Sequence, residues 1–249
     1  MLIDTHCHIH ESDYPLPIGE VISRAAEAGV GRYICVGTDA VSSRDAVRFA
    51  EDHEATFAAI GVHPHETKDG YDAVAQLAGT SDKIIAVGEI GLDYFYTHSP
   101  REVQMQALEA QIMIALAHKL PIIFHVREAF DDFWPIFDKF PGIRGELHSF
   151  TDSKENLDKA IARGLYIGVN GISTFTKDEV QRVTFDSIPL DRLLLETDAP
   201  FLTPAPFRGK VNEPAFVRSI AEYHADRRGI SLDEISSATT ANAHALFAF

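Results

Sequence analysis

The stretch Lys83-Ile84-Ile85-Ala86-Val87-Gly88-Glu89-Ile90 decides the fold class of this chain. From Ile84 to Val87 the stretch is continuously apolar, which is typical of a parallel β-strand covered on both faces. Its acidic residue, Glu89, comes only at the end of the run. Arg192-Leu193-Leu194-Leu195 is a second run of this kind. Both indicate an α/β protein built on a parallel sheet.

Eight strand-like runs alternate with helix-like segments along the 249 residues. This alternation and the chain length match a TIM (β/α)8 barrel. The competing layout is a doubly wound open sheet, which has no reason to gather polar residues at almost every strand end. The predicted strands are Leu2–His6, Tyr33–Gly37, Thr56–Val62, Ile84–Ile90, Pro121–Val126, Ile143–Phe150, Leu165–Asn170 and Arg192–Thr197.

Helix signals fill the gaps between these strands. Capping boxes begin at Ser99, Thr176 and Ser231, each with a glutamate three residues later. The first of them carries a proline at the expected first helical position and opens a long helix to about Lys119. No linker or low-complexity segment interrupts the pattern. We therefore expect one TIM-barrel domain over residues 1–249, with two small domains as the alternative.

The charge composition limits how the protein could bind nucleic acid, but it does not limit which reaction the protein could catalyse. The 22 basic and 37 acidic residues leave a net charge of −15, which argues against a basic groove for duplex nucleic acid. A phosphate-handling site is still compatible with this charge, because bound cations reverse the local field. No segment resembles a signal peptide or a membrane span. Cys7 and Cys35 are expected to be reduced and buried. We expect a cytoplasmic monomer.

Six candidate metal ligands lie at the ends of five apolar runs. His6 and His8 are two residues apart on one strand, so both imidazoles leave the same face. Each residue alone is also explained as a hydrogen-bonded polar group at a sheet margin. Chance would have to place all of them at the same end of separate strands, which favours a metal site. The candidate ligands are His6, His8, Glu89, His125, His148 and Asp198.

These residues suggest a centre with two divalent cations. We expect His6, His8, Glu89 and Asp198 around one cation. Glu89 would also ligate the second, together with His125 and His148, because one carboxylate can give an oxygen to each of two cations. Imidazole and carboxylate ligands suit Zn²⁺ or Mn²⁺, with Mg²⁺ possible at a looser site. Such a pair can activate a water molecule for hydrolysis.

Catalytic roles follow for residues at this rim. Asp198 and Glu89 are expected to be catalytic, with Asp198 orienting the attacking water and accepting its proton. His63, at the end of the third strand, is a candidate ligand, general acid or phosphate contact. Arg127 and Arg208 are candidate contacts for an anionic substrate. Ordinary polar chemistry of a barrel rim is the alternative for these last three.

Strand parity predicts supporting carboxylates below the ligands. Asp4, Glu146 and Glu196 each lie two residues before a candidate ligand, so they should face the same way. They could accept the free N–H groups of ligating imidazoles. A salt-linked barrel interior explains them equally well.

The motifs together resemble the TatD family of metal-dependent hydrolases. One departure is Asp152, where the family usually has glycine; it puts the loop after His148 in doubt, but no ligand is lost. The matching segments are Ile3–His8, Gly61–Pro64, Gly88–Tyr94, Ile123–Ala129, His148–Thr151, Glu196–Pro204 and Arg208–Pro214.

The resemblance implies a TIM barrel with a divalent-metal site. It also implies deoxyribonuclease activity, typically exonucleolytic on DNA ends, through the six candidate ligands. We therefore expect a phosphodiesterase that acts on DNA ends or short single strands, which need only local contacts.

Two other functions compete with this hypothesis. An amidohydrolase or lactonase could use a similar site on a small molecule, but many such barrels bridge their metals with a carboxylated lysine. Glu89 stands at the equivalent position here, and the nearest lysine, Lys83, lies at the other end of the strand. A barrel that only binds or assembles is disfavoured because every candidate ligand is present.

Overall fold

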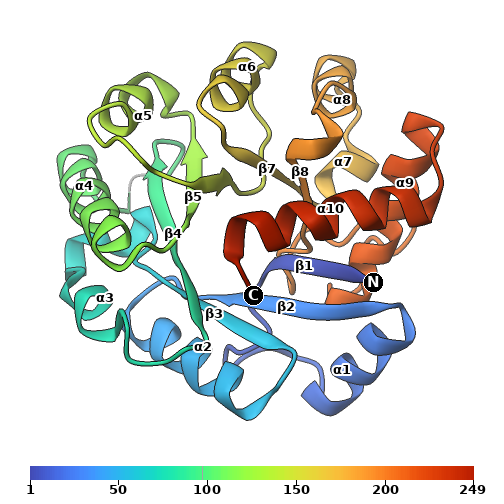
Figure 1. Ribbon diagram of the computed structural model, residues 1–249, viewed down its shortest axis with the longest axis horizontal. Helices are drawn as coiled ribbons and strands as arrows, with labels where there is room; N and C mark the ends of the chain where they lie inside the picture. Colours follow the sequence, from blue (N-terminus) through green and yellow to red (C-terminus); the bar gives the residue numbers. More distant parts are fainter. Residues whose placement is uncertain (97) are drawn as a thin grey trace. The chain divides into compact units, whose positions relative to one another are not determined.

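The computed structural model describes residues 1–96 and 98–249, and Figure 1 labels its elements. Strands and helices alternate along the chain, as the sequence predicts. The eight strands in the described residues are β1 (Leu2–Cys7), β2 (Val30–Val36), β3 (Thr56–Ile60), β4 (Ile84–Asp93), β5 (Ile122–Arg127), β6 (Gly145–Leu147), β7 (Tyr166–Val169) and β8 (Leu193–Leu195).

Helices follow the strands along the chain. Three short 3-10 helices accompany them: η1 (Pro64–Asp69), η2 (Leu190–Arg192) and η3 (Pro214–Phe216). The α-helices of the described residues are α1 (Ile18–Glu27), α2 (Ala40–Asp52), α3 (Asp72–Leu77), α4 (Arg101–His118), α5 (Phe130–Phe137), α6 (Lys154–Ala162), α7 (Ile172–Phe175), α8 (Glu179–Asp186), α9 (Val217–Arg228) and α10 (Leu232–Phe247).

The chain forms two compact units. Unit 1 comprises residues 1–34 and 149–248, and unit 2 comprises residues 35–148 together with Phe249. Each unit has strands at its centre and helices against them. The single domain expected over residues 1–249 stays a prediction.

The sheet of unit 2 contains β3, β4, β5 and β6, paired in parallel and in sequence order. All ten residues of β4 are buried, which confirms that a continuously apolar strand is covered on both faces. Figure 1 shows α3 and α4 on one side of β4. In the register of β4 and β5, Gly91 lies opposite His125 and Asp93 lies opposite Arg127. The polar ends of these two strands are therefore neighbours.

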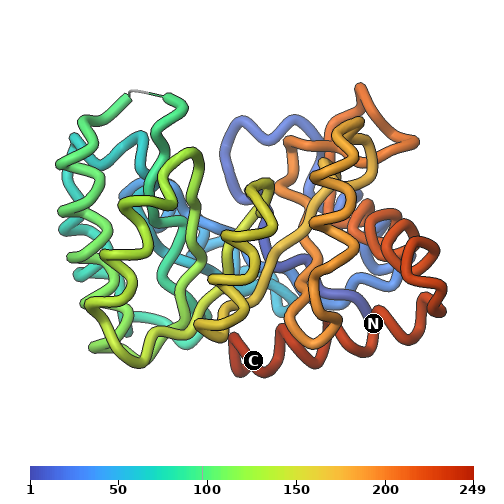
Figure 2. Tube along the Cα trace, turned by 90° about the horizontal axis from the view of Figure 1, so that it is seen from above, coloured from blue at the N-terminus to red at the C-terminus, as the bar shows by residue number. Residues whose placement is uncertain are grey.

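The strands of unit 1 include β7 and β8, which are parallel, and β1, whose Cys7 forms an isolated parallel bridge with Ala199, four residues beyond the end of β8. Helix α10 lies across β1 and β8, and α9 adjoins it (Figures 1 and 2). The Asn242 side chain donates to the carbonyl oxygens of Leu190 and Leu193, and Thr240 donates to that of Met1. Helix α10 therefore covers the beginnings of β1 and β8 and leaves the other ends of these strands for the site.

The predicted strands are all present, although some of their ends differ. The strand predicted to end at Ile90 continues as β4 to Asp93. The strand predicted over Ile143–Phe150 is shorter, because regular pairing in β6 covers only Gly145–Leu147. Cys7 and Cys35 are both buried free thiols, as expected.

Only one of the three predicted capping residues caps its helix. Ser231 accepts a hydrogen bond from the backbone N–H of Glu234 and caps α10, as predicted. At α8 the cap is Asp178 rather than Thr176, since the Asp178 carboxylate accepts from Val180 and Gln181. At α4 the N-cap is Pro100, without a side-chain hydrogen bond. The predictions for Ser99 and Thr176 were therefore wrong.

Ser99 is used elsewhere. Its hydroxyl donates to the carbonyl oxygen of His65 at 2.7 Å and accepts from the backbone N–H of Lys68 at 3.2 Å. The side chain thus ties the start of α4 to η1 instead of capping its own helix. A local sequence motif cannot reveal this competition with a distant loop.

Candidate metal centre

Unit 1 brings together His6, His8 and Asp198, which we call the first cluster. The Nε2 atoms of His6 and His8 are 3.1 Å apart. The Oδ1 atom of Asp198 lies 3.3 Å from Nε2 of His8 and 3.7 Å from Nε2 of His6. Ligands about 2 Å from a cation stand roughly 3 Å from one another, so these three donors suit one cation. The structure thus brings these three residues together within unit 1, and their role as metal ligands stays a prediction.

The backbone holds the first cluster in place. The N–H of Asp198 donates to the carbonyl oxygen of His6, and the N–H of His8 donates to that of Ala199. Asp198 adopts a left-handed backbone conformation with φ of 58°. Such conformations cost free energy in residues with a side chain and gather at functional sites. The chain turns sharply just where the carboxylate must face the two imidazoles.

Asp4 supports this turn from below. One of its carboxylate oxygens accepts from the backbone N–H of Thr197 at 2.8 Å, and the other accepts from the Thr197 hydroxyl at 2.5 Å. Burial raises the pKa of Asp4 to about 8, while the bonds to Thr197 oppose that rise. Asp4 does lie in the interior, as predicted, but these bonds position the backbone before Asp198 rather than an imidazole ring.

Glu196 is also buried, and one of its carboxylate oxygens accepts from the backbone N–H of Ser149 at 2.8 Å. It therefore holds the turn that follows His148. Glu146 is fully buried as well. The inward orientation predicted for these carboxylates agrees with their burial.

Unit 2 gathers three imidazoles around one carboxylate oxygen. The Oε1 atom of Glu89 lies 2.7 Å from Nδ1 of His125, 3.7 Å from Nε2 of His148 and 3.8 Å from Nε2 of His63. We call Glu89, His125, His148 and His63 the second cluster. Ligand atoms of His63, Glu89 and His125 all lie within 4.8 Å of one another. This set again offers the mixed nitrogen and oxygen donors of a divalent-cation site.

Two glycines let the strands of unit 2 approach closely. A Cβ atom on Gly88 would lie 2.6 Å from Cβ of Ile123. A Cβ atom on Gly91 would lie 1.7 Å from the carbonyl oxygen of His125, and Gly91 has a φ of 155°. Glycine is therefore required on both sides of Glu89, because a larger residue would push β4 away from β5.

Asp93 is a site residue that sequence reasoning missed. Its Oδ2 atom lies 3.0 Å from Nε2 of His125 and 3.1 Å from Nε2 of His65. His65, in η1, thus reaches the same carboxylate as His125. The available signal was the motif Gly91-Leu92-Asp93, but a strand that ends at Ile90 would leave Asp93 in a loop.

The carboxylates of unit 2 make the second cluster attractive to a positive charge. Burial alone would lower the pKa of His125, but the hydrogen bonds that its ring donates to Asp93 and Glu89 outweigh this effect and raise that pKa to about 9. Burial and the charge of His125 lower the pKa of His63 to about 3. A divalent cation bound here would compete with the proton on His125, because metal binding releases ligand protons.

The two arginines predicted to contact substrate are exposed. The guanidinium carbon of Arg127 lies 3.9 Å from the ring centre of Phe95. Arg208 donates to the carbonyl oxygen of Thr203 at 2.8 Å and stacks on Phe175 at 3.9 Å. Their contact with substrate stays a prediction.

A family model described as TatD related DNase matches residues 3–248 of the chain. The chain belongs to the TatD family. It is 38% identical to an uncharacterized metal-dependent hydrolase, YabD, of Bacillus subtilis, with 99% of each chain covered. It is 34% identical to a 3′-5′ ssDNA/RNA exonuclease, TatD, of Citrobacter rodentium, covering 99% of this chain and 97% of that protein. The TatD-family chain is thus a metal-dependent hydrolase.

A solved structure confirms the fold class. The TatD homologue YjjV of Escherichia coli K12 is 31% identical, with a TM-score of 0.92, over 100% of this chain and 98% of that chain. Together with the eight strands and their alternating helices, this shows the predicted TIM (β/α)8 barrel. The family match also confirms the resemblance inferred from the motifs.

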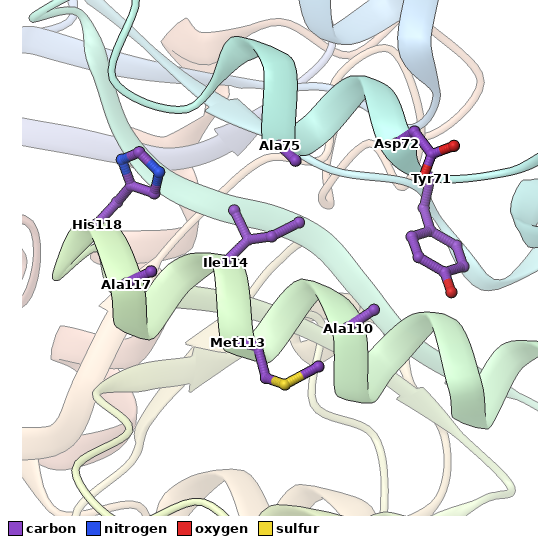
Figure 3. A pocket seen from close by; sticks show the side chains of 8 residues that line it. All are labelled: Tyr71, Asp72, Ala75, Ala110, Met113, Ile114, Ala117 and His118. Carbon is purple, nitrogen blue, oxygen red and sulfur yellow. The ribbon is translucent and has the colours of Figure 1, made fainter.

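A groove away from the ligands is lined mainly by apolar side chains of α3 and α4. Figure 3 shows Ala75 on one helix and Ile114 on the other pointing towards it. Together with Ala110 and Met113 they line a cavity of 320 Å³. No residue of either cluster lines it. In the described part of the chain, no helix is both long and apolar enough to span a membrane.

Proposed function

We propose that this TatD-family hydrolase is a divalent-metal-dependent phosphodiesterase that acts on DNA at strand ends or on short single strands. The observation that carries the proposal is the arrangement of Glu89, whose Oε1 atom faces three imidazoles of unit 2. His6, His8 and Asp198 of the first cluster offer another set of nitrogen and oxygen donors. The names of the exonuclease relatives support a nucleic-acid substrate.

We assign the ligand roles by cluster. His6, His8 and Asp198 would hold one cation, and Glu89, His125 and His148 a second. Bridging of the two by Glu89 stays a prediction from the sequence, as does the choice among Zn²⁺, Mn²⁺ and Mg²⁺. When bound, such cations lower the pKa of water and neutralise charge on a phosphodiester.

The side chains of the protein would then carry out the remaining steps. Asp198 would accept a proton through its carboxylate and orient the attacking water. Burial and the neighbouring His125 lower the pKa of His63, which favours a neutral ring that can hydrogen-bond a phosphate oxygen. We therefore propose His63 as a phosphate contact rather than a general acid.

The rival function is hydrolysis of an amide or lactone through a carboxylated lysine. Lys83 does not suit that role, because its Nζ donates to the carbonyl oxygens of Glu54 and Thr56 at 2.8 and 3.0 Å. These bonds hold the side chain at the beginning of β4, whereas Glu89 is the sixth of the ten residues of that strand. This placement favours the phosphodiesterase.

The proposal is tested by digestion of DNA labelled at one end, as single and as double strands, with Mn²⁺, Mg²⁺ or Zn²⁺ added. We expect shortening of the single strand from one end and loss of this activity in Asp198→Ala. An enzyme that leaves all DNA and RNA intact but hydrolyses an amide or lactone would establish the rival function instead.

A further inference from the structure

Two exposed aromatic side chains follow β4 immediately. Phe95 and Tyr96 are 48% and 44% exposed, and their ring centres are 4.6 Å apart at an angle of 86°. Single exposed aromatic residues are common, but two adjacent ones beside a polar site are a typical recognition feature. Neither the fold nor the proposed metal ligation explains their exposure.

Arg127 lies over both rings. Its guanidinium carbon is 3.9 Å from the ring centre of Phe95 and 5.3 Å from that of Tyr96. The Arg127 side chain is exposed, in a chain whose net charge is −15. Stacking holds the guanidinium plane while its N–H donors stay available to an anion.

Asp93 connects these rings directly to the second cluster. Its Oδ1 atom accepts from the backbone N–H groups of Phe95 and Tyr96 at 3.0 and 3.1 Å. Its Oδ2 atom contacts His125 at 3.0 Å. The backbone N–H of Tyr94 also donates to the carbonyl oxygen of Arg127 at 2.9 Å. One carboxylate therefore positions the aromatic pair and a candidate metal ligand together.

Space for a planar group lies beside Tyr96. A cavity of 320 Å³ is lined there by Tyr96, His98, Arg101 and Gln104, among others. The rings of Tyr96 and His98 are 5.7 Å apart and tilted by 32°. The cavity thus combines an aromatic wall with hydrogen-bonding side chains, as expected of a pocket for a nucleobase.

We propose that Phe95, Tyr96 and Arg127 form a nucleotide subsite, an inference that rests on the proposed nuclease function. The base of one nucleotide stacks on Tyr96, and a phosphate of the same strand binds the Arg127 guanidinium. Stacking on an aromatic ring accepts every base, so the subsite is tolerant of sequence. It selects single strands, because a base within a duplex is stacked between its neighbours and has no free face.

The first test measures binding by the metal-loaded full chain to single-stranded oligonucleotides with phosphorothioate linkages, which resist cleavage. Bases are replaced by abasic sites one position at a time. We expect the wild type to lose affinity about tenfold when one particular position is abasic. Tyr96→Ala should bind the complete strand about tenfold more weakly and should no longer distinguish it from that abasic strand.

Two variants serve as controls. Tyr96→Phe keeps the ring and should keep the preference for a base. Tyr166→Ala removes a ring that lies under Arg192 at 5.2 Å in unit 1 and should change neither affinity nor preference. Arg127→Ala should reduce the steepness of the salt dependence of binding by about one phosphate contact.

The possible failures are distinguishable. A wild type that ignores abasic sites at every position, or a Tyr96→Ala variant that keeps the full preference for a base, overturns the subsite while hydrolysis of DNA can still be observed. Absence of hydrolysis together with a base preference that Tyr96→Ala removes overturns the proposed function but supports the subsite. A wild type that binds no single strand overturns the subsite as well.

Discussion

Glu89 is the central residue of the second cluster, since its Oε1 atom faces His63, His125 and His148. Glu89→Gln keeps the shape but removes the charge. We expect kcat/KM for strand cleavage to fall about 10²- to 10⁴-fold, with weaker metal binding in calorimetry. Glu102→Gln makes the same change at an exposed position of α4 and should leave both quantities unchanged. Full activity in Glu89→Gln would refute the assigned role.

His224 provides a pH-dependent effect on stability away from the ligands. It is fully buried on α9, its Nε2 atom is 2.9 Å from the Ser173 hydroxyl, and burial with the charge of Arg228 lowers its pKa to about 3. Because the unfolded chain binds a proton near pH 6.5 and the folded chain does not, His224 should make the folded state less stable as pH falls from 6.5 towards 3.

This effect is measured by urea unfolding of the wild type and His224→Gln at several pH values. The wild type should lose up to about 1.4 kcal/mol per pH unit more than the variant in that interval. Equal slopes for the two proteins would show that His224 does not contribute.

At the residue scale, the ligands at the strand ends were predictable because each one follows an apolar run. His6, His8 and Asp198 converge in unit 1, as that pattern indicates. Asp93 and His65 were not predictable in the same way. Their roles depend on how far β4 extends and on the path of η1, which packing rather than local pattern determines.

At the scale of elements, close approach of β4 and β5 is what places Glu89 beside His125. Gly91→Ala would bring a Cβ atom to 1.7 Å from the carbonyl oxygen of His125. We expect a large loss of both activity and melting temperature. Gly142→Ala is the matched control, because Gly142 also has a positive φ, 88°, but has no atom within 4 Å of the added Cβ.

The control separates backbone strain from the steric clash. Gly142→Ala should lower the free energy of unfolding only by the cost of a left-handed backbone at a residue with a Cβ atom, about 1–2 kcal/mol, and should keep activity. If Gly91→Ala were no more harmful than Gly142→Ala, the tight contact of β4 with β5 would not be needed for the site.

The capping residues show which element boundaries a sequence can predict. Ser231 caps α10 as its motif indicates, because its hydroxyl accepts from the backbone N–H of Glu234. Ser99 bonds to η1 instead. Asp152, the departure from the family pattern, accepts from Ser153 and Asn156 at the start of α6. The change at Asp152 is therefore absorbed by local hydrogen bonds in that turn.

At the scale of the whole molecule, the net charge of −15 predicts weak and local contact with nucleic acid. If Arg127 and Arg208 provide the phosphate contacts, the logarithm of the affinity for a single strand should fall with the logarithm of salt concentration with a slope of about −1.4. Titrations by fluorescence anisotropy over a range of salt concentrations would measure this slope. A much steeper slope would require a basic surface that this account does not include.

The fold class was predictable because the apolar strands repeat with helices between them, as at Ile84–Val87 and Leu193–Leu195. The division into two compact units was not, because contact density between segments distant in sequence leaves no mark on local composition. The number of bound cations could not be predicted in the same way. The types of the candidate ligands indicate which metals suit the site, but not how many ions bind there.

The most direct test of the central claim is removal and return of the metal with one labelled single-stranded DNA. The protein is treated with a chelator, dialysed, and assayed before and after stoichiometric addition of Mn²⁺ or Zn²⁺, with bound metal measured in the same samples. The account predicts that strand cleavage disappears with the metal and returns in proportion to bound cation. Cleavage that persists in the metal-free protein would contradict it.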